Sequence, residues 1–521
     1  MNRKQFLKTA GIGTASLLAA PMIAEQISLK MKSKHDYSQA FGLARSLREE
    51  HSYHPLVEGK IPAEIRGTLY RNGPGLFERD GYRKANILDG DGMVQAFRFA
   101  KGAVHYRNRF VRTHKWLDEE AADKYLYNTW TTRRPGGMLK NAFFQGKFKG
   151  QAGVTVRVLN GKLYAFDESS LPYRLDPETL ETLNGEVDFG VHFENARTLF
   201  AAHNKVDGQT GEWVQFGLEN GPKANIQLSI FEASGQLKRQ RRYELSLGTY
   251  MHDFFVSENH IVFNLQPAVM NPLSFVLGMD SYVDSLRWKH KQGSTFLVVH
   301  KSLQGEPLYL GTEATWMWHS VNAFERGGEI FCYFCGYDEP DHFLGDHAQT
   351  FAIMRPNADP ADAGIAISAG SIRLVRIDPK KGKIRQEILN HDLDRTYEFP
   401  VINEQFTSHP NSYCYLASGD RMGAFHHAIN RVHLESGKTE TYDFGEGLYC
   451  GEPIFVPRPG HRYSSSLVQE PGWLMTLAFD RAADKSFLAI LNAEALADGP
   501  VAKIHIDHHS PMSFHGTWHG A

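Results

Sequence analysis

Four histidines stand in local settings that could carry metal chemistry: His203, His252, His319 and His515. Imidazole is a common ligand of iron, copper and zinc, and four imidazoles without a carboxylate or thiolate form a neutral ligand set. None of their separations is a local metal-binding spacing, so spacing alone does not select them from the chain's 25 histidines. If all four converge, the fold must return the last residues to the middle of the molecule, which predicts a closed, metal-centred structure.

The elements that would position these histidines are strands. Short runs rich in β-branched and aromatic residues recur between turn signals, and no long segment has a helical period. Residues 154–159 and 162–166 flank Asn160-Gly161, the dipeptide that most favours a tight hairpin turn. A looser hairpin pattern recurs at residues 173–180, 230–237, 374–383 and 431–438. Such repetition in 521 residues favours an all-β propeller, with a large sandwich or barrel as the alternative.

Two segments interrupt the strand pattern. A short helix is expected over residues 118–127, followed by a polar, glycine-rich stretch, and residues 266–288 read as an insertion that contains the apolar residues 271–278. Exposed apolar loops can mark membrane contact or a ligand entrance. The alternative is that both segments simply cover the core.

Two further motifs favour structural interpretations. Asp89-Gly90-Asp91-Gly92 lacks the remaining ligands of a calcium loop, so we expect a turn in which the carboxylates bind backbone N–H groups and the glycines have positive φ. Cys332 and Cys335 have CxxC spacing but lie in an apolar run typical of a strand. Buried thiols are therefore expected rather than a redox or zinc pair.

Several short sequences together resemble the carotenoid cleavage oxygenase family, which includes carotenoid and stilbene dioxygenases and the retinal pigment epithelium isomerohydrolase. The resemblance runs from about residue 55 to residue 518 in the family's order. Beyond the four histidine segments, it is carried by residues 70–75, 88–94, 171–176, 397–403 and 451–456. Each sequence is weak alone, and their common order makes the resemblance specific.

The resemblance implies a seven-bladed β-propeller, with short helices and loops forming a cap over an Fe(2+)-bearing axis. His203, His252, His319 and His515 match the family's iron ligands. Glu168, Glu398 and Glu452 match glutamates that hydrogen-bond the outer ring nitrogens of three ligands, although Asp167 is an alternative to Glu168. A carboxylate in that place fixes the imidazole's tautomer and orientation and raises its basicity.

The function implied is an Fe(II)-dependent dioxygenase that uses O2 to cleave a conjugated C=C bond of a carotenoid or apocarotenoid into two carbonyl products. One alternative is a stilbene-type dioxygenase acting on resveratrol or lignostilbene, for which Tyr106 and Lys149 are candidates to engage a phenolic oxygen. A second alternative is a non-oxidative isomerase or a carotenoid-binding propeller. Phe275, in the apolar insertion, is a candidate substrate contact at a membrane-facing tunnel mouth.

The composition and the first residues of the chain limit these hypotheses. With 42% apolar and 22% charged residues and a formal charge of -2, the chain has no basic excess for nucleic acid. Residues 1–26 have the basic, apolar and small-residue layout of an export signal and resemble a twin-arginine signal in which lysine replaces the second arginine. We therefore expect a periplasmic protein that can associate with a membrane, and a cytoplasmic protein is the alternative if the signal is wrongly assigned. Residues 27–54 would be a linker or helical extension, and residues 55–521 one propeller domain.

Overall fold

The computed structural model describes residues 37–144, 149–168, 170–192, 199–219, 224–245, 248–344, 368–389, 394–421, 425–461 and 470–521. The predicted export signal lies outside these residues. No helix among the described residues is long and apolar enough to cross a membrane.

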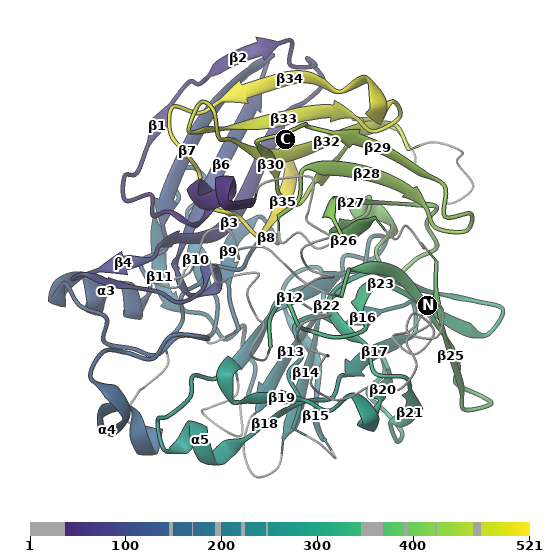
Figure 1. The fold of residues 1–521 in the computed structure, drawn as a ribbon. Helices are drawn as coiled ribbons and strands as arrows, with labels where there is room; N and C mark the ends of the chain where they lie inside the picture. Colours follow the sequence, from purple (N-terminus) through teal and green to yellow (C-terminus); the bar gives the residue numbers. More distant parts are fainter. Residues whose placement is uncertain are drawn as a thin grey trace, which may run out of the picture.

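Seven antiparallel sheets surround a common axis and form a seven-bladed β-propeller, as predicted (Figure 1). The first blade joins both ends of the chain: β1 (Ser52–Tyr53), β7 (Ala103–Phe110), β6 (Asp91–Ala100), β3 (Gly67–Leu76) and β35 (His515–Gly520). The second contains β11 (Thr182–Glu186), β10 (Tyr173–Leu175), β9 (Lys162–Phe166) and β8 (Thr155–Leu159). The third contains β12 (Leu199–Val206), β13 (Trp213–Glu219), β14 (Asn225–Phe231) and β15 (Leu237–Glu244).

The remaining four blades follow in chain order. The fourth contains β16 (Phe255–Val256), β17 (His260–Leu265), β20 (Ser294–His300) and β21 (Leu308–Thr312). The fifth contains β22 (Trp316–Arg326), β23 (Glu329–Tyr337), β24 (Ser371–Asp378) and β25 (Lys383–Ile388). The sixth contains β26 (Arg395–Val401), β27 (Tyr413–Asp420), β28 (Ala428–His433) and β29 (Thr439–Asp443). The seventh contains β2 (Leu56–Gly59), β34 (Pro500–His505), β33 (Lys485–Asn492), β32 (Gly472–Asp480), β30 (Leu448–Cys450) and β31 (Ile454–Pro457).

Smaller elements lie between these strands. Two hairpin-like pairs are β4 (Glu78–Arg79) with β5 (Tyr82–Arg83), and β18 (Ala268–Met270) with β19 (Leu286–Trp288). Among the described residues, the α-helices are α3 (His114–Ala122), α4 (Gly137–Asn141) and α5 (Pro272–Val276). The 3-10 helices are η1 (Tyr37–Ala44), η2 (Ile87–Asp89), η3 (Ala142–Phe144), η4 (Val283–Ser285), η5 (His290–Gln292), η8 (Glu404–Phe406) and η9 (Leu496–Asp498).

Two strand exchanges close the ring. The last strand, β35, pairs with β3 in the first blade, where His515 lies opposite Asn72. In return, β2 from the start of the chain pairs with β34 in the seventh blade. Chain ends far apart in sequence are thereby held in shared sheets, and His515 is placed beside the axis only when the first and last blades meet.

The predicted hairpins correspond to pairs of neighbouring strands within blades. The Asn160-Gly161 turn joins β8 to β9, and both residues have positive φ, as a tight hairpin requires. The four looser repeats are the outer pairs β10–β11, β14–β15, β24–β25 and β28–β29. The predicted insertion is also real, because residues 266–288 carry β18, α5 and β19 between two strands of the fourth blade.

Three details differ from the predictions. The helix expected at 118–127 is α3, which begins earlier because the Thr113 side chain accepts a hydrogen bond from the Trp116 N–H and caps the helix. Gly90 has an extended φ of -75°, so positive φ does not explain this glycine. A Cβ there would lie 2.6 Å from Pro74, and one at Gly92 would lie 2.3 Å from the Ala152 carbonyl oxygen. The end of the expected linker, residues 27–54, belongs to the first blade, because β1 lies within it and pairs with β7.

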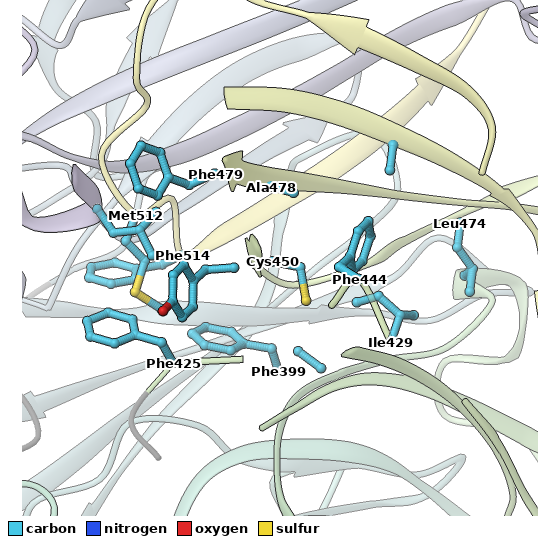
Figure 2. Close-up of a cluster of buried hydrophobic side chains, with 14 of the residues drawn as sticks. Phe399, Phe425, Ile429, Phe444, Cys450, Leu474, Ala478, Phe479, Met512 and Phe514 are labelled. Carbon is cyan, nitrogen blue, oxygen red and sulfur yellow. The ribbon is translucent and has the colours of Figure 1, made fainter. Parts of the chain in front are cut away.

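Apolar side chains fill the spaces between blades. A cluster between the sixth and seventh blades contains Phe399, Phe425, Met512 and Phe514 at one end, where their side chains lie close together (Figure 2). All four cysteines are buried free thiols, as expected for Cys332 and Cys335 on β23.

Candidate metal centre

The fold brings the four predicted histidines together. His203 lies on β12, His319 on β22 and His515 at the start of β35, while His252 precedes β16. One ring nitrogen of each lies within 4.8 Å of the others. The Nε2 atoms of His203 and His252 are 2.9 Å apart, and those of His252 and His319 are 3.2 Å apart. Residues separated by more than three hundred positions therefore share one point on the propeller axis.

Irregular strand pairing accompanies these side chains. The β12–β13 register shifts between Phe200 and Asn204, across His203. The β22–β23 register shifts between Met317 and Ser320, across His319. Such bulges bend a strand locally and redirect side chains, and they are common beside functional sites. Here they release the histidines from the regular alternation of a blade.

Three histidines have carboxylate partners, and these are the glutamates predicted from the sequence. His319 Nδ1 lies 2.5 Å from Glu398 Oε2, and His515 Nδ1 lies 2.8 Å from Glu452 Oε1. His252 Nδ1 contacts Glu168 Oε1. A carboxylate accepts a hydrogen bond from Nδ1–H, so the ring proton stays on Nδ1 and the Nε2 lone pair is free to bind a metal.

Asp167 does not take the role considered for it as an alternative to Glu168. Its carboxylate accepts hydrogen bonds from the backbone N–H groups of Gln151 and Ala152, and from the Ser170 hydroxyl. These bonds hold the segment just before β8 against the loop that follows β9. Glu168, the next residue, is the one that reaches a histidine.

Burial sets the electrostatics of the site. Burial, with a contribution from the neighbouring imidazoles, holds the pKa values of His203 and His515 well below the usual histidine range, so both rings are neutral. For His252, burial lowers the pKa, but Glu168 outweighs this effect and the net pKa is raised. Burial raises the pKa of Glu452 to about 7, although Arg71 opposes that shift.

This donor set fits a divalent metal ion. Two nitrogens that each lie ~2.1 Å from one ion, at a right angle, are about 3 Å apart. The measured Nε2 separations of 2.9 and 3.2 Å agree with that arrangement. Four imidazole nitrogens suit iron, copper or zinc, and they leave positions of an octahedral ion open to other ligands.

An apolar cavity opens on one side of the four-histidine group. His252, His319 and His515 form part of its wall, and the cavity has a volume of about 110 Å³. The remaining wall is largely aromatic and includes Trp130, Tyr250, Trp318, Phe343, Phe399 and Phe514. Such a cavity suits an apolar ligand with little hydrogen-bonding capacity.

A second, polar cavity reaches the same group from the other side. His203, His319 and His515 line it together with charged residues such as Arg157 and Asp253. Of these two cavities, His203 lines the polar one and His252 lines the apolar one. The histidine group separates two chemically different spaces.

The structure does not bring the three candidate substrate residues to the apolar cavity wall. Tyr106 is buried in the blade core, where its hydroxyl donates to Gln95 Oε1 at 3.2 Å. Lys149 forms an ion pair with Asp118 at 2.7 Å, on a partly exposed surface. Phe275, on α5, packs against Tyr282, which in turn packs against the wall residue Trp130.

Three residues with a part in the site were not identified from the sequence. Arg71 is fully buried on β3 and donates to the Glu452 carboxylate at 3.0 Å, and Tyr250 donates to Glu168 at 3.1 Å. His342 lines the apolar cavity. Two of them could have been identified from the sequence. Arg71 lies in one of the short sequences that carry the family resemblance, and Tyr250 is two residues from His252. His342 had no such signal.

The fold and the site define a class, the seven-bladed propeller with a four-histidine candidate metal centre on its axis. Residues 44–520 match the family described as "Retinal pigment epithelial membrane protein". The chain is 30% identical over 479 residues to the apocarotenoid-15,15'-oxygenase of Synechocystis, covering 89% of this chain and 92% of the relative. It is 28% identical to the isoeugenol monooxygenase of Pseudomonas nitroreducens, covering 89% and 93%.

The solved structures agree with the sequence comparison. A cobalt-substituted apocarotenoid oxygenase from Synechocystis superposes with a TM-score of 0.85 and 28% identity, covering 94% of this chain and all of that one. The protein belongs to the retinal pigment epithelial membrane protein family, that is, to the carotenoid cleavage oxygenases, as the sequence resemblance indicated. Its curated relatives named here are oxygenases.

Proposed function

We propose that the protein is an Fe(II)-dependent dioxygenase that cleaves a conjugated C=C bond of a carotenoid or apocarotenoid with O2, giving two carbonyl products. The observation that carries this proposal is the aromatic cavity whose wall includes three of the four converging histidines. An apolar polyene would fill that cavity, and its double bond would lie beside the metal position. The 30% identity to an apocarotenoid oxygenase supports the same substrate class.

The residues of this chain would bind, orient and exclude water. The four imidazoles would hold Fe(II), which when bound supplies a centre for O2 activation. The three glutamates keep each Nδ1 proton in place, so that Nε2 remains the metal-facing nitrogen. The aromatic wall fixes the substrate by shape, because an alkene offers no polar group to hold.

A stilbene-type activity is the second candidate, because relatives at 27% identity include lignostilbene and resveratrol cleavage oxygenases. The tyrosine and lysine that would engage a phenol on the sequence argument are Tyr106 and Lys149, and neither lines the cavity. This placement favours the polyene.

Product analysis tests the proposal. Protein reconstituted anaerobically with Fe(II) would be given an apocarotenal, resveratrol or isoeugenol under 18O2. We expect aldehyde products that carry the label from the apocarotenal. Turnover of resveratrol alone would reverse the order of the two candidates, and turnover of isoeugenol alone would support neither of them. An isomerised product without label would instead show a non-oxidative enzyme.

We also propose that an exposed apolar surface delivers the substrate from a membrane. This patch contains Leu139 on α4, Phe143 in η3 and Leu273 on α5, which are 82%, 69% and 67% exposed. Gly278 lies against the chain at Asn141, and Figure 1 shows α4 and α5 side by side at one edge of the propeller. Lipid is a natural partner for so much exposed apolar surface.

Vesicle binding tests the patch. The double variant Leu139→Glu and Leu273→Glu is expected to lose co-sedimentation with phospholipid vesicles while its unfolding transition is unchanged. The exposed Leu183, in β11 on a different blade, offers a matched control as Leu183→Glu. Equal loss in the control would reject the patch. Periplasmic export, which depends on residues 1–26, remains a separate proposal that cell fractionation tests.

A further inference from the structure

A buried carboxylate outside the metal group holds one part of the apolar cavity wall. Asp89, at the end of η2, is fully buried. Its Oδ1 accepts a hydrogen bond from the Thr131 backbone N–H at 3.0 Å. Its Oδ2 accepts from the hydroxyl groups of Thr131 and of Thr132, the latter at 2.5 Å. Bonds to an ionised carboxylate are stronger than bonds between neutral groups, so one side chain restrains the two residues that follow Trp130.

Asp89 itself stands on a fixed support. The Gln151 side chain donates from Nε2 to the carbonyl oxygens of Leu88, at 3.0 Å, and of Gly90, at 2.9 Å. These two residues flank Asp89 in the chain, so its backbone is held on both sides. A restrained backbone makes the carboxylate a stationary anchor for the segment that contains Trp130.

Trp130 is the residue through which this anchor reaches the cavity. It lines the wall, and its ring lies edge-on to Tyr250 at 6.2 Å and to Tyr282 at 5.1 Å between centroids. Its carbonyl oxygen accepts from the Val283 N–H at 3.1 Å. Tyr282 and Val283 belong to the insertion in the fourth blade, whereas Tyr250 lines the cavity and donates to Glu168. Trp130 therefore lies between the insertion and the side of the cavity next to the metal centre.

The position of this ring matters for ligand binding. Trp130 lies in neither a helix nor a strand, and its side chain is only partly buried against the neighbouring aromatic cluster. An indole on such a segment has several rotamers open to it unless the backbone beside it is restrained. An aromatic wall selects a ligand by shape only while its rings stay in place.

We propose that Asp89 is a positioning residue for the apolar cavity. Its hydrogen bonds to Thr131 and Thr132 hold Trp130 in the wall, and this restraint fixes the fit of an apolar polyene beside the metal centre. The inference rests on the proposed function for the identity of the ligand, whereas the restraint on Trp130 can be measured without any ligand.

Two sets of variants test whether these bonds hold Trp130. Asp89→Asn removes the charge with little change of shape. Thr131→Val with Thr132→Val removes both hydroxyl donors, whereas Thr131→Ser with Thr132→Ser keeps them. The contribution of Trp130 to near-UV circular dichroism is the difference between each protein and the same protein carrying Trp130→Phe. We expect Asp89→Asn and the valine pair to lose most of that contribution and the serine pair to retain it; full retention in all three would overturn the proposal.

A double-mutant cycle tests whether Asp89 acts on the ligand through Trp130. Affinity for an apocarotenal would be measured by the change in its visible absorption, in anaerobic cobalt-loaded protein so that no turnover is needed. Asp89→Asn alone should lower affinity about tenfold, the scale of one aromatic contact. With Trp130→Ala already present, the same change should cost less than about twofold, because residues that act through one contact are not additive.

Asp207→Asn is the matched control, because Asp207 is a buried carboxylate that holds the turn between β12 and β13 through the N–H groups of Gln209 and Thr210. Its affinity for the apocarotenal should equal that of the wild-type protein. An equal loss from Asp89→Asn in both backgrounds, or the same loss in the control, would overturn the proposal. Failure of the proposed function has a different signature: an apocarotenal that is not bound or not cleaved would overturn the ligand assignment, while the dichroism of Trp130 would still depend on Asp89.

Discussion

Replacing Glu398 by glutamine tests the argument that the carboxylates orient the histidines. Glu398 Oε2 accepts from His319 Nδ1 at 2.5 Å and from the Phe399 backbone N–H at 2.5 Å. Its Oε1 is buried without a partner among the described residues. A glutamine can keep its oxygen at the Oε2 position and place its NH2 group where Oε1 lies, so the geometry is preserved and the negative charge is lost.

The magnitude follows from that exchange. A hydrogen bond to a charged group contributes about 1.5–3 kcal/mol, and a neutral one about 0.5–1.5 kcal/mol. The His319 bond therefore weakens by about 1–1.5 kcal/mol, which lowers metal affinity about tenfold. If the Phe399 bond also holds the carboxylate in place, the loss approaches about 100-fold, the upper range for such outer partners. Phe399 has a φ of +54°, an uncommon value for a residue with a side chain, so this bond restrains a strained backbone.

Metal competition provides the measurement. Wild-type and Glu398→Gln proteins would be titrated with Co(II) against a chelator of known affinity, with circular dichroism as a check of folding. Glu313→Gln is the matched control, because Glu313 is an exposed residue just before the strand that carries His319. Affinity within twofold of wild type in Glu398→Gln would refute the orienting role. A similar loss in the control would show that the effect is not specific to the site.

Three further predictions concern the same centre. His319→Ala should abolish both bound iron and activity, measured by metal analysis and product formation, and full activity in this variant would refute the site assignment. Tyr250→Phe removes the hydroxyl that donates to Glu168, so metal affinity should fall a few-fold with little change in the urea midpoint of unfolding. Because burial raises the pKa of Glu452 to about 7, the metal-free protein binds a proton there that metal binding must release. Metal affinity should therefore rise as pH increases through about 7, and a flat profile between pH 6 and 8 would contradict this.

The raised pKa of Glu452 also predicts how the stability of the metal-free protein changes with pH. A carboxyl group whose pKa is raised on folding binds protons more tightly in the folded state than in the unfolded state. Between its ordinary pKa and about 7, stability should therefore decrease as pH rises, because the folded protein must give up that proton. The Arg71 contact at 3.0 Å opposes this effect, so the decrease should be smaller than for an unpaired buried carboxyl group.

The four histidines and three glutamates could be predicted only because the short sequences around them resemble those of the family. The separations of the histidines carry no geometric information, because blade lengths and loop insertions determine them. The hairpins were more direct, since the Asn160-Gly161 turn and the repeated outer pairs follow from local conformational preferences. The helix start was mispredicted because the cap at Thr113 lies before the polar run that suggested the helix.

The substrate residues could not be predicted in the same way. Tyr106 and Lys149 were suggested by approximate position in the chain, but a one-residue change in strand register reverses the face on which a side chain lies. Tyr106 faces the blade core and Lys149 pairs at the surface. His342 reached the cavity wall from a loop after β23, where no periodic pattern predicts direction.

The sequence by itself determined the all-β class, the family resemblance and the residues able to bind a metal, because these depend on residue types and local order. Only the tertiary structure decided that Glu168 rather than Asp167 reaches His252, and that the histidine group divides an aromatic cavity from a polar one. It also decided that His515 stands at the axis, since β35 completes the first blade. These facts depend on how seven sheets meet around a closed ring, where contacts join residues that are hundreds of positions apart.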